Sequence, residues 1–173
     1  MNEQILMDVV ERMRSRFYGK YRGTVTKVGT ASEGGLGRIK AKIPAVLGDV
    51  ESGWCMPCVP YAGDQAGIAF LPEQDAGVWI EFEGGDVSYP IWVGCYWHTD
   101  EMPGRVAPDV KVIRSRGKQQ IVLDDSDHSI TITDANENSV TLDRDGITIV
   151  RKSGKVAVTE HKVSVNDGAM EVT

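Results

Sequence analysis

The fold of the C-terminal half is indicated most clearly by residues 129–150, which have the sequence SITITDANENSVTLDRDGITIV. Three short triplets in this stretch place an apolar residue on each side of a threonine, at Ile130–Ile132, Val140–Leu142 and Ile147–Ile149. Alternation of this kind is typical of a half-buried β-strand, and the Asp, Asn and Gly residues between the triplets are typical of turns. The stretch therefore predicts a run of very short strands joined by tight turns.

The same pattern continues on both sides of this stretch. It includes Ile121 before it and Val156–Val158, Val163–Val165 and Met170–Val172 after it, with successive starts seven to ten residues apart. Residues 111–173 contain no Phe, Trp, Tyr, Pro or Cys. Because no large side chain is available to fill a thick core, we interpret these residues as a repeat array of short strands with a thin aliphatic core.

A single ribbon of this kind is not expected to be stable alone. It buries too little apolar surface to offset the conformational entropy of ordering the chain, and short strands leave edges that need a partner. Several copies intertwined about one axis would solve both problems, so we expect an oligomeric β-helix or prism. The alternative is a single-chain meander packed against the N-terminal half. The predicted core consists of Ile121, Ile130, Ile132, Val140, Leu142, Ile147, Ile149, Val156, Val158, Val163 and Val165.

The N-terminal half reads as a small barrel. Its short alternating or apolar runs are bounded by glycine-rich turns, among them residues 29–37 and 84–86. The predicted strands are residues 21–28, 38–43, 53–60, 67–71, 78–82 and 91–97. Five or six short strands within about 80 residues favour a closed barrel, and their order suits an OB-type barrel.

A short amphipathic helix is predicted ahead of the barrel, over residues 3–18 with a stop at Gly19. Its apolar stripe consists of Ile5, Leu6, Val9, Val10, Met13 and Phe17. A helix of about sixteen residues is marginal alone, so this stripe must be buried against its own domain or a partner. We divide the chain into this helix (1–19), the barrel (20–98), a linker (99–110) that contains Pro103 and Pro108, and the strand array (111–173).

Composition and charge exclude several classes. The chain has 173 residues and a net charge of −6, and neither half carries the basic footprint that nucleic-acid binding requires. The sequence contains no run of 18 apolar residues, so it predicts no transmembrane helix. Residues 1–8 lack the basic and apolar regions of a secretory signal. The aromatic side chains of the barrel leave single-stranded nucleic-acid binding as an alternative, which the acidic charge disfavours.

The cysteines suggest two kinds of chemistry. Cys55 and Cys58 stand in a string, WCMPC, that imitates a thioredoxin active site, but the following residues continue a strand instead of beginning a helix. Together with Cys95 and His98 they have the spacing of two zinc knuckles, although both pairs fall in predicted strands. We interpret Cys58 and Cys95 as small hydrophobic residues of the barrel, and zinc binding is an alternative.

A hydrolytic triad is not predicted, because the three histidines are scattered and none stands beside a nucleophile elbow. Residues 124–127, with the sequence DDSD, resemble part of a calcium loop but lack its glycine and its distant glutamate. A solvated turn is the preferred interpretation. We therefore expect no enzymatic activity, no cofactor and no metal.

Three stretches resemble the phage baseplate assembly protein V family: residues 53–63 (GWCMPCVPYAG), 78–86 (VWIEFEGGD) and 89–94 (YPIWVG). This family includes the central spikes of contractile phage tails, the valine–glycine repeat G proteins of type VI secretion and extracellular contractile injection systems. The resemblance implies a structural role, in shaping the barrel and its subunit contacts, for Trp54, Trp79, Glu81, Phe82, Gly84, Gly85, Asp86 and Pro90.

The resemblance also implies an assembly. The expected fold class is all-β: an OB-fold barrel, followed by an intertwined trimeric β-helix that forms a needle, with a short N-terminal helix. A homotrimer would sit beneath the hub of a baseplate, assemble in the cytoplasm as part of a phage tail or injection-system particle, and transmit the force of contraction to a target membrane. The linker is too short for the lysozyme domain of some spikes. Because no His-x-His motif follows His161, we expect a separate tip protein of the Pro-Ala-Ala-Arg repeat type, seated on Met170 and Val172.

Overall fold

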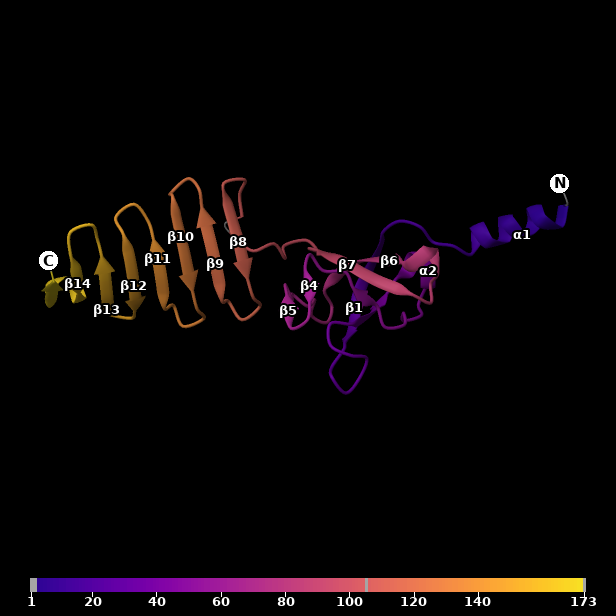
Figure 1. The fold of residues 1–173 in the computed structure, drawn as a ribbon, viewed down its shortest axis with the longest axis horizontal. Helices are drawn as coiled ribbons and strands as arrows, with labels where there is room; N and C mark the ends of the chain where they lie inside the picture. The colour runs from indigo at the N-terminus through magenta and orange to yellow at the C-terminus, as the bar shows by residue number, and fades with distance from the viewer. Residues whose placement is uncertain (1–2, 105, 173) are drawn as a thin grey trace. The chain divides into compact units, whose positions relative to one another are not determined.

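The computed structural model describes residues 3–104 and 106–172, so residues 1–2, 105 and 173 of the predicted segments lie outside the described residues. The chain divides into two compact units, residues 1–100 and 101–173 (Figure 1). The fold is almost entirely β, as the sequence predicts. We describe each unit by itself.

The N-terminal unit contains one regular helix and a curled sheet. Its elements are α1 (Glu3–Arg14), β1 (Tyr21–Val28), β2 (Ile39–Lys42), the one-turn helix α2 (Pro44–Leu47), β3 (Met56–Pro57), β4 (Ala62–Gly63), β5 (Ala66–Gly67), β6 (Gly77–Phe82), the 3₁₀ turn η1 (Glu83–Gly85) and β7 (Pro90–Tyr96). The strand order of the main sheet is β2-β1-β6-β7-β3. Isolated bridges from Ile39 to Cys55 and from Lys42 to Glu51 join edge strand β2 to the segment before β3. The sheet therefore closes on itself, which agrees with the predicted OB-type barrel.

The interior of this barrel follows from strand alternation. Residues of β1, β2 and β6 are buried at every second position, and the segment before β3 adds Cys55. Val25, Ile39, Ile80 and Cys55 have no exposed surface. The buried cluster consists of Val25, Ile39, Ala41, Ile43, Cys55, Val78, Ile80, Phe82 and Trp92.

Three predicted elements of this unit differ from the structure. Of the strand predicted over residues 53–60 only Met56–Pro57 forms β3, because Pro57 and Pro60 have no backbone N–H with which to extend a ladder. The helix ends at Arg14 instead of running to residue 18, because Phe17 leaves the helical path to pack on the barrel, with its ring centroid 6.4 Å from that of Phe82. Residues 67–71 were predicted as a strand, but only Ala66–Gly67 pairs, in a two-residue ladder with Ala62–Gly63. Ile68 and Phe70 are exposed there, so the apolar composition of this run reflects a loop and not a buried strand.

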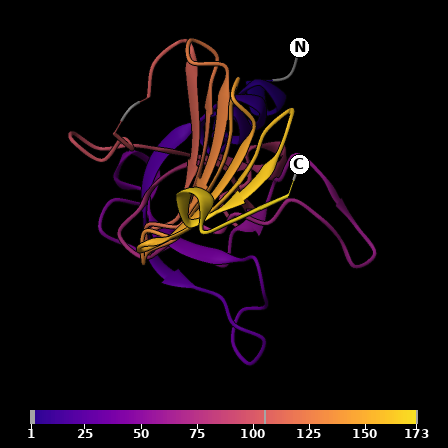
Figure 2. The same ribbon diagram turned by 90° about the vertical axis from the view of Figure 1, so that its left-hand side faces the viewer.

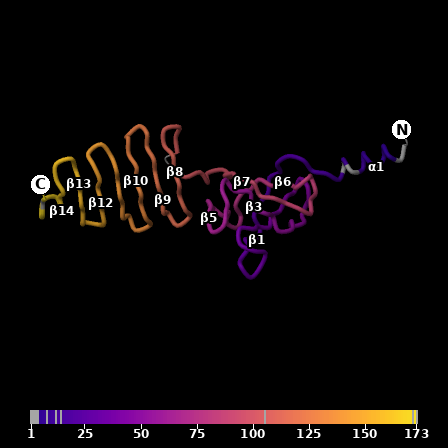
Figure 3. Tube along the Cα trace, viewed as in Figure 1, coloured from indigo at the N-terminus to yellow at the C-terminus, as the bar shows by residue number. Residues whose placement is uncertain are grey.

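The C-terminal unit is a single antiparallel meander. Its strands are β8 (Val110–Arg114), β9 (Gln120–Asp124), β10 (Ser129–Thr133), β11 (Ser139–Leu142), β12 (Ile147–Arg151), β13 (Gly154–Val158), β14 (Val163–Val165) and β15 (Met170–Val172), with a 3₁₀ turn η2 (Asn166–Gly168). Each strand pairs with its neighbours in sequence, so the order runs from β8 to β15 without a crossover. The turns lie alternately at the two ends of the strands (Figures 2 and 3).

This pairing differs in one respect from the pairing expected from the sequence. The strand edges were expected to meet other chains, but hairpins within this chain pair them, and only the outer edges of β8 and β15 end the ladder among the described strands. In a single chain, the part of the sheet that still needs a partner is therefore one of its faces, and not the edges of its inner strands. The intertwining of copies remains a prediction.

Candidate trimerisation face and barrel signature

One face of the C-terminal sheet carries two columns of aliphatic side chains. The register places Ile121 opposite Ile132, Ile132 opposite Val140, and Val140 opposite Ile149. This first column contains Ile113, Ile121, Ile132, Val140, Ile149, Val156, Val165 and Met170. The second column contains Leu123, Ile130, Leu142, Ile147, Val158, Val163 and Val172. We call these two columns the apolar face.

The opposite face of the sheet is mostly polar in its central column. Thr131 pairs with Thr141, which pairs with Thr148, and this column continues to Ala157 and Ser164. In the other direction it continues to two apolar residues, Val122, which is buried, and Val112. Successive side chains of a strand point to opposite faces, so every threonine of a triplet lies on the polar face while its aliphatic neighbours lie on the apolar one. The triplet pattern of the sequence therefore encodes a two-sided sheet.

The apolar face is uncovered in a single chain. Ile132 is 47% exposed and Ile149 is 48% exposed, although each lies in the middle of a regular strand. A continuous exposed patch of large aliphatic side chains on a regular sheet is a mark of an interaction surface. The surface extends over all eight strands and has no cover among the described residues of its own unit.

All eleven residues predicted as the needle core lie on this face. Their role in holding a trimer together remains a proposal. Sequence reasoning missed Ile113 and Leu123, which belong to the same columns. The signal was present, because Leu123 follows Ile121 at the two-residue spacing of one strand face. Met170 and Val172, the predicted platform for a tip protein, end the two columns on β15, whose only described partner is β14.

In the barrel, the turn at residues 84–86, which we call the signature turn, holds the segment that follows the N-terminal helix. The Phe17 backbone N–H donates to the Gly85 carbonyl oxygen at 2.8 Å, and Arg16 forms an ion pair with Asp86 at 2.9 Å. Gly84 and Gly85 have φ of 56° and 77°, a region that favours glycine. A Cβ on Gly85 would lie 3.1 Å from both the Arg16 Cβ and the Phe17 nitrogen. Only glycine therefore allows this close approach without strain.

Asp86 also fixes the turn that follows. Its Oδ1 accepts a hydrogen bond from the Ser88 backbone N–H at 3.0 Å. This bond, with a smaller contribution from the Arg16 guanidinium, lowers the pKa of Asp86 below its ordinary value. The carboxylate therefore stays ionised and serves both the turn and the ion pair.

The other residues to which the family resemblance assigns a structural role make contacts within the barrel. Phe82 packs with Phe17 and Tyr21, and Glu81 forms an ion pair with Lys20. Pro90 is buried and pairs with Phe82 across β6 and β7. The remaining two are tryptophans in contact with cations: the Arg22 guanidinium lies 5.5 Å from the Trp79 ring centroid, and the Lys40 ammonium lies 5.4 Å from that of Trp54.

The cysteines are not grouped as the alternative zinc site requires. Within residues 3–104 and 106–172, no group of three or more His, Cys, Asp or Glu residues is placed to hold a metal ion. Cys55 is buried in the barrel core, while Cys58 and Cys95 are exposed. The interpretation of Cys58 and Cys95 as interior residues is therefore wrong, and Cys55 fills that place. Burial raises the pKa of the Cys55 thiol, which is the opposite of what thioredoxin-like chemistry needs.

Residues 124–127 form a turn, as expected. The Asp124 Oδ1 accepts hydrogen bonds from the Ser126 Oγ at 2.6 Å and from the Ser126 and Asp127 backbone N–H groups at 3.1 Å. The carboxylate that begins the loop is thus engaged in closing it. In the described part of the chain, no helix has both the length and the apolar character needed to cross a membrane.

Two family models match the chain, and no curated protein does. The model of the type VI secretion system/phage-baseplate injector OB domain matches residues 21–97, which are the barrel. The model of the phage baseplate V C-terminal trimerisation domain matches residues 111–171, which are the strand array. The two matches together cover most of the sequence and follow the two units of the structure. The chain therefore belongs to the phage baseplate V family of baseplate spike proteins.

Proposed function

We propose that this protein is the central spike subunit of a contractile tail or injection-system baseplate. The observation that carries the proposal is the apolar face, which a single chain leaves exposed along the whole length of its trimerisation domain. Three copies that turned their apolar faces toward one axis would enclose a core of about forty-five aliphatic side chains, because each contributes two columns. The family is structural, and the proposed role is mechanical, without a catalytic step.

The proposed mechanism is the transmission of axial force to a target envelope. In the three-sheet core, each strand lies across the length of the array, and every strand from β9 to β14 is hydrogen-bonded to the strands on both sides of it. Pulling one copy out would expose its apolar face to water while the other two lost their partner. Such a needle resists loss of a single chain, as an object driven into a membrane must.

Two partners complete the proposal. The barrel, residues 20–98, would join the hub of the baseplate, and the end of the needle at Met170 and Val172 would seat a separate tip protein. One edge of β15 has no partner among the described strands, and two apolar side chains of β15 are exposed. Both support the second contact, because they can extend the ladder and the core. Assembly would take place in the cytoplasm of the producing cell.

Localisation on purified particles tests this function. Antibodies against the barrel should label the baseplate end of intact contractile particles, and tomography should show the needle at the particle axis. The paired substitution Met170→Ser/Val172→Ser, which adds no charge to the apolar columns, should weaken co-purification of a tip protein while the trimer persists. A protein that is absent from particles and remains in the soluble fraction of lysed producing cells would contradict the proposal.

A further inference from the structure

The charges of the strand array form a pattern that the apolar face does not explain. Successive turns of the meander lie at alternate ends of the strands, which divides the charged residues into two rows (Figure 3). Row I comprises the charged residues in or beside the turns β9–β10, β11–β12 and β13–β14 and at the start of β8. Row II comprises those in or beside the turns β8–β9, β10–β11, β12–β13 and β14–β15.

The two rows have opposite net charge. Among the described residues 111–172, Glu171 is the only charged residue outside the rows. Row I has six acidic residues against three basic ones, Lys111, Arg144 and Lys162; the acidic residues are Asp124, Asp125, Asp127, Asp143, Asp145 and Glu160. Row II has six basic residues against three acidic ones, Asp134, Glu137 and Asp167; the basic residues are Arg114, Arg116, Lys118, Arg151, Lys152 and Lys155. The net charge is therefore −3 on row I and +3 on row II. Asp124 is buried in its own turn, and the ion pairs Lys111–Asp125 and Lys155–Asp167 each lie within one row, so these five residues do not carry the contact.

We infer that the rows are complementary surfaces, and that row I of each copy lies beside row II of the next copy in the trimer. This inference rests on the proposed packing of three copies through the apolar face. Cyclic assembly around an axis along the array joins one side of every sheet to the opposite side of its neighbour. That arrangement brings unlike rows together at all three junctions. An antiparallel neighbour would bring like rows together, so the rows select the parallel trimer.

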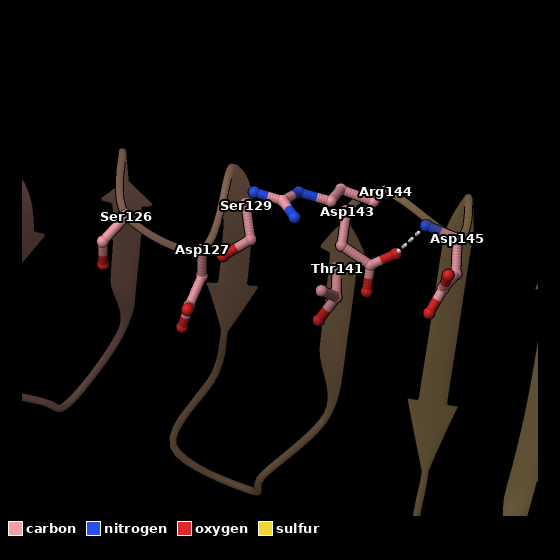
Figure 4. Close-up of a pocket in the computed structure, with 7 residues that line it drawn as sticks. All are labelled: Ser126, Asp127, Ser129, Thr141, Asp143, Arg144 and Asp145. Atoms are coloured by element: carbon pink, nitrogen blue, oxygen red, sulfur yellow. Dashed lines mark hydrogen bonds between the residues drawn. The ribbon is translucent and has the colours of Figure 1, made fainter.

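The shape of row I suits this contact. A hollow opens beside the turns β9–β10 and β11–β12, lined by Asp127, Ser129, Thr141, Asp143, Arg144 and Asp145 (Figure 4). Its lining has three carboxylates, Asp127, Asp143 and Asp145, against one cation, Arg144, so its net charge still suits the end of a long basic side chain such as those that row II presents. The apolar face and the rows thus have different roles. Burial of aliphatic surface gives the trimer its affinity, and the rows give the parallel orientation and the register of its copies.

Two of the acidic residues allow a clean test, because the carboxylates that close the turns belong to other residues. Asp124 accepts the hydrogen bonds of its turn, and Asp143 accepts from the backbone N–H of Asp145 at 2.9 Å. Row I can therefore be reversed by Asp127→Lys/Asp145→Lys, and row II by Lys118→Glu/Lys152→Glu. The variant that carries all four substitutions reverses the sign of both rows, to a net charge of +1 on row I and −1 on row II, and restores the net charge of the chain.

The measurement is urea-induced trimer dissociation of the full chain at about 50 mM and about 1 M sodium chloride, since salt screens exposed charges. We expect each single-row reversal to raise the trimer dissociation constant about tenfold or more at low salt, since several pairs change sign at three junctions, and high salt to remove most of this effect. The neutral control, Asp127→Asn/Asp145→Asn, should show a smaller increase.

The variant with all four substitutions tests whether the rows pair, because the two reversals compensate each other only if the rows are complementary. Dissociation close to that of the unaltered chain supports the inference, and an effect equal to the sum of the two reversals overturns it. Ile132→Asp separates this inference from the proposed function. If Ile132→Asp leaves the trimer intact, the proposed packing fails; if it dissociates the trimer while the row variants change nothing, only the pairing of rows fails.

Discussion

At the scale of single residues, Gly85 shows how a short signature serves packing. Its positive φ and the 3.1 Å approach of Arg16 and Phe17 to a Cβ at this position leave no room for a side chain. We expect Gly85→Ala to destabilise the barrel by about 1–3 kcal/mol. All four tryptophans lie before residue 98, so tryptophan fluorescence during urea unfolding reports on the barrel alone.

The control for this prediction is Gly53→Ala. A Cβ on Gly53 meets nothing within 4 Å, and its φ lies outside the left-handed region. This variant should unfold at nearly the same urea concentration as the unaltered chain. Equal midpoints for Gly85→Ala and Gly53→Ala would show that the signature turn does not hold the segment after the helix.

Asp134 predicts an acid-sensitive turn in the needle. Hydrogen bonds from Asn138 and Asn136 lower the pKa of Asp134 from 3.8 to about 2. A carboxyl whose pKa is lower in the folded state stabilises the fold above its unfolded pKa, and this contribution is lost as the pH falls from about 4 to about 2. Asp134→Asn should therefore lower the urea midpoint of the needle at pH 5, measured by far-ultraviolet circular dichroism.

The difference between Asp134→Asn and the unaltered chain should shrink as the pH is lowered through this window. Asp127→Asn serves as the control for the loss of one carboxylate charge, including any contribution of that charge to row I, because Asp124 accepts the hydrogen bonds of its turn. A difference that is the same at pH 5 and at pH 2 would contradict the assigned role of Asp134.

At the scale of elements, the strand triplets were predictable because alternation and turn residues are local signals. The register, and with it the assignment of Thr131 and Ile132 to opposite faces, follows from the same alternation once hairpins connect neighbouring strands. The end of α1 was not predictable, since Phe17 leaves the helical pattern for a tertiary contact. The interior place of Cys55 was missed for a similar reason, because bridges to β2, and not a regular strand, position it.

The two-sided sheet gives a prediction within one strand. Ile132→Asp places a charge on the apolar face of every copy, and we expect it to weaken the trimer by about 3 kcal/mol or more per copy, because a buried charge without a partner is strongly unfavourable. Thr131→Asp, one residue earlier on the polar face, should retain the trimer. Sedimentation velocity distinguishes the two, and equal behaviour of both variants would contradict the assignment of the faces.

At the scale of the whole molecule, the barrel is the unit that can fold alone, and the needle is the unit that assembles the copies. The barrel has its own buried core, whereas the needle has its apolar residues on one exposed face. A chain truncated after Asp109 should therefore keep a cooperative tryptophan-fluorescence transition and lose or weaken trimerisation. A truncated chain that remains as firmly trimeric as the full one would show that the barrel, and not the strand array, assembles the spike.

The central claim is that three copies share the apolar face, and the mass of the full chain in solution tests it most directly. Light scattering coupled to size exclusion, at micromolar concentration, should give about three times the chain mass of 18.9 kDa. The same value should persist at moderate urea concentrations that unfold the barrel. A particle of 18.9 kDa under these conditions would contradict the account.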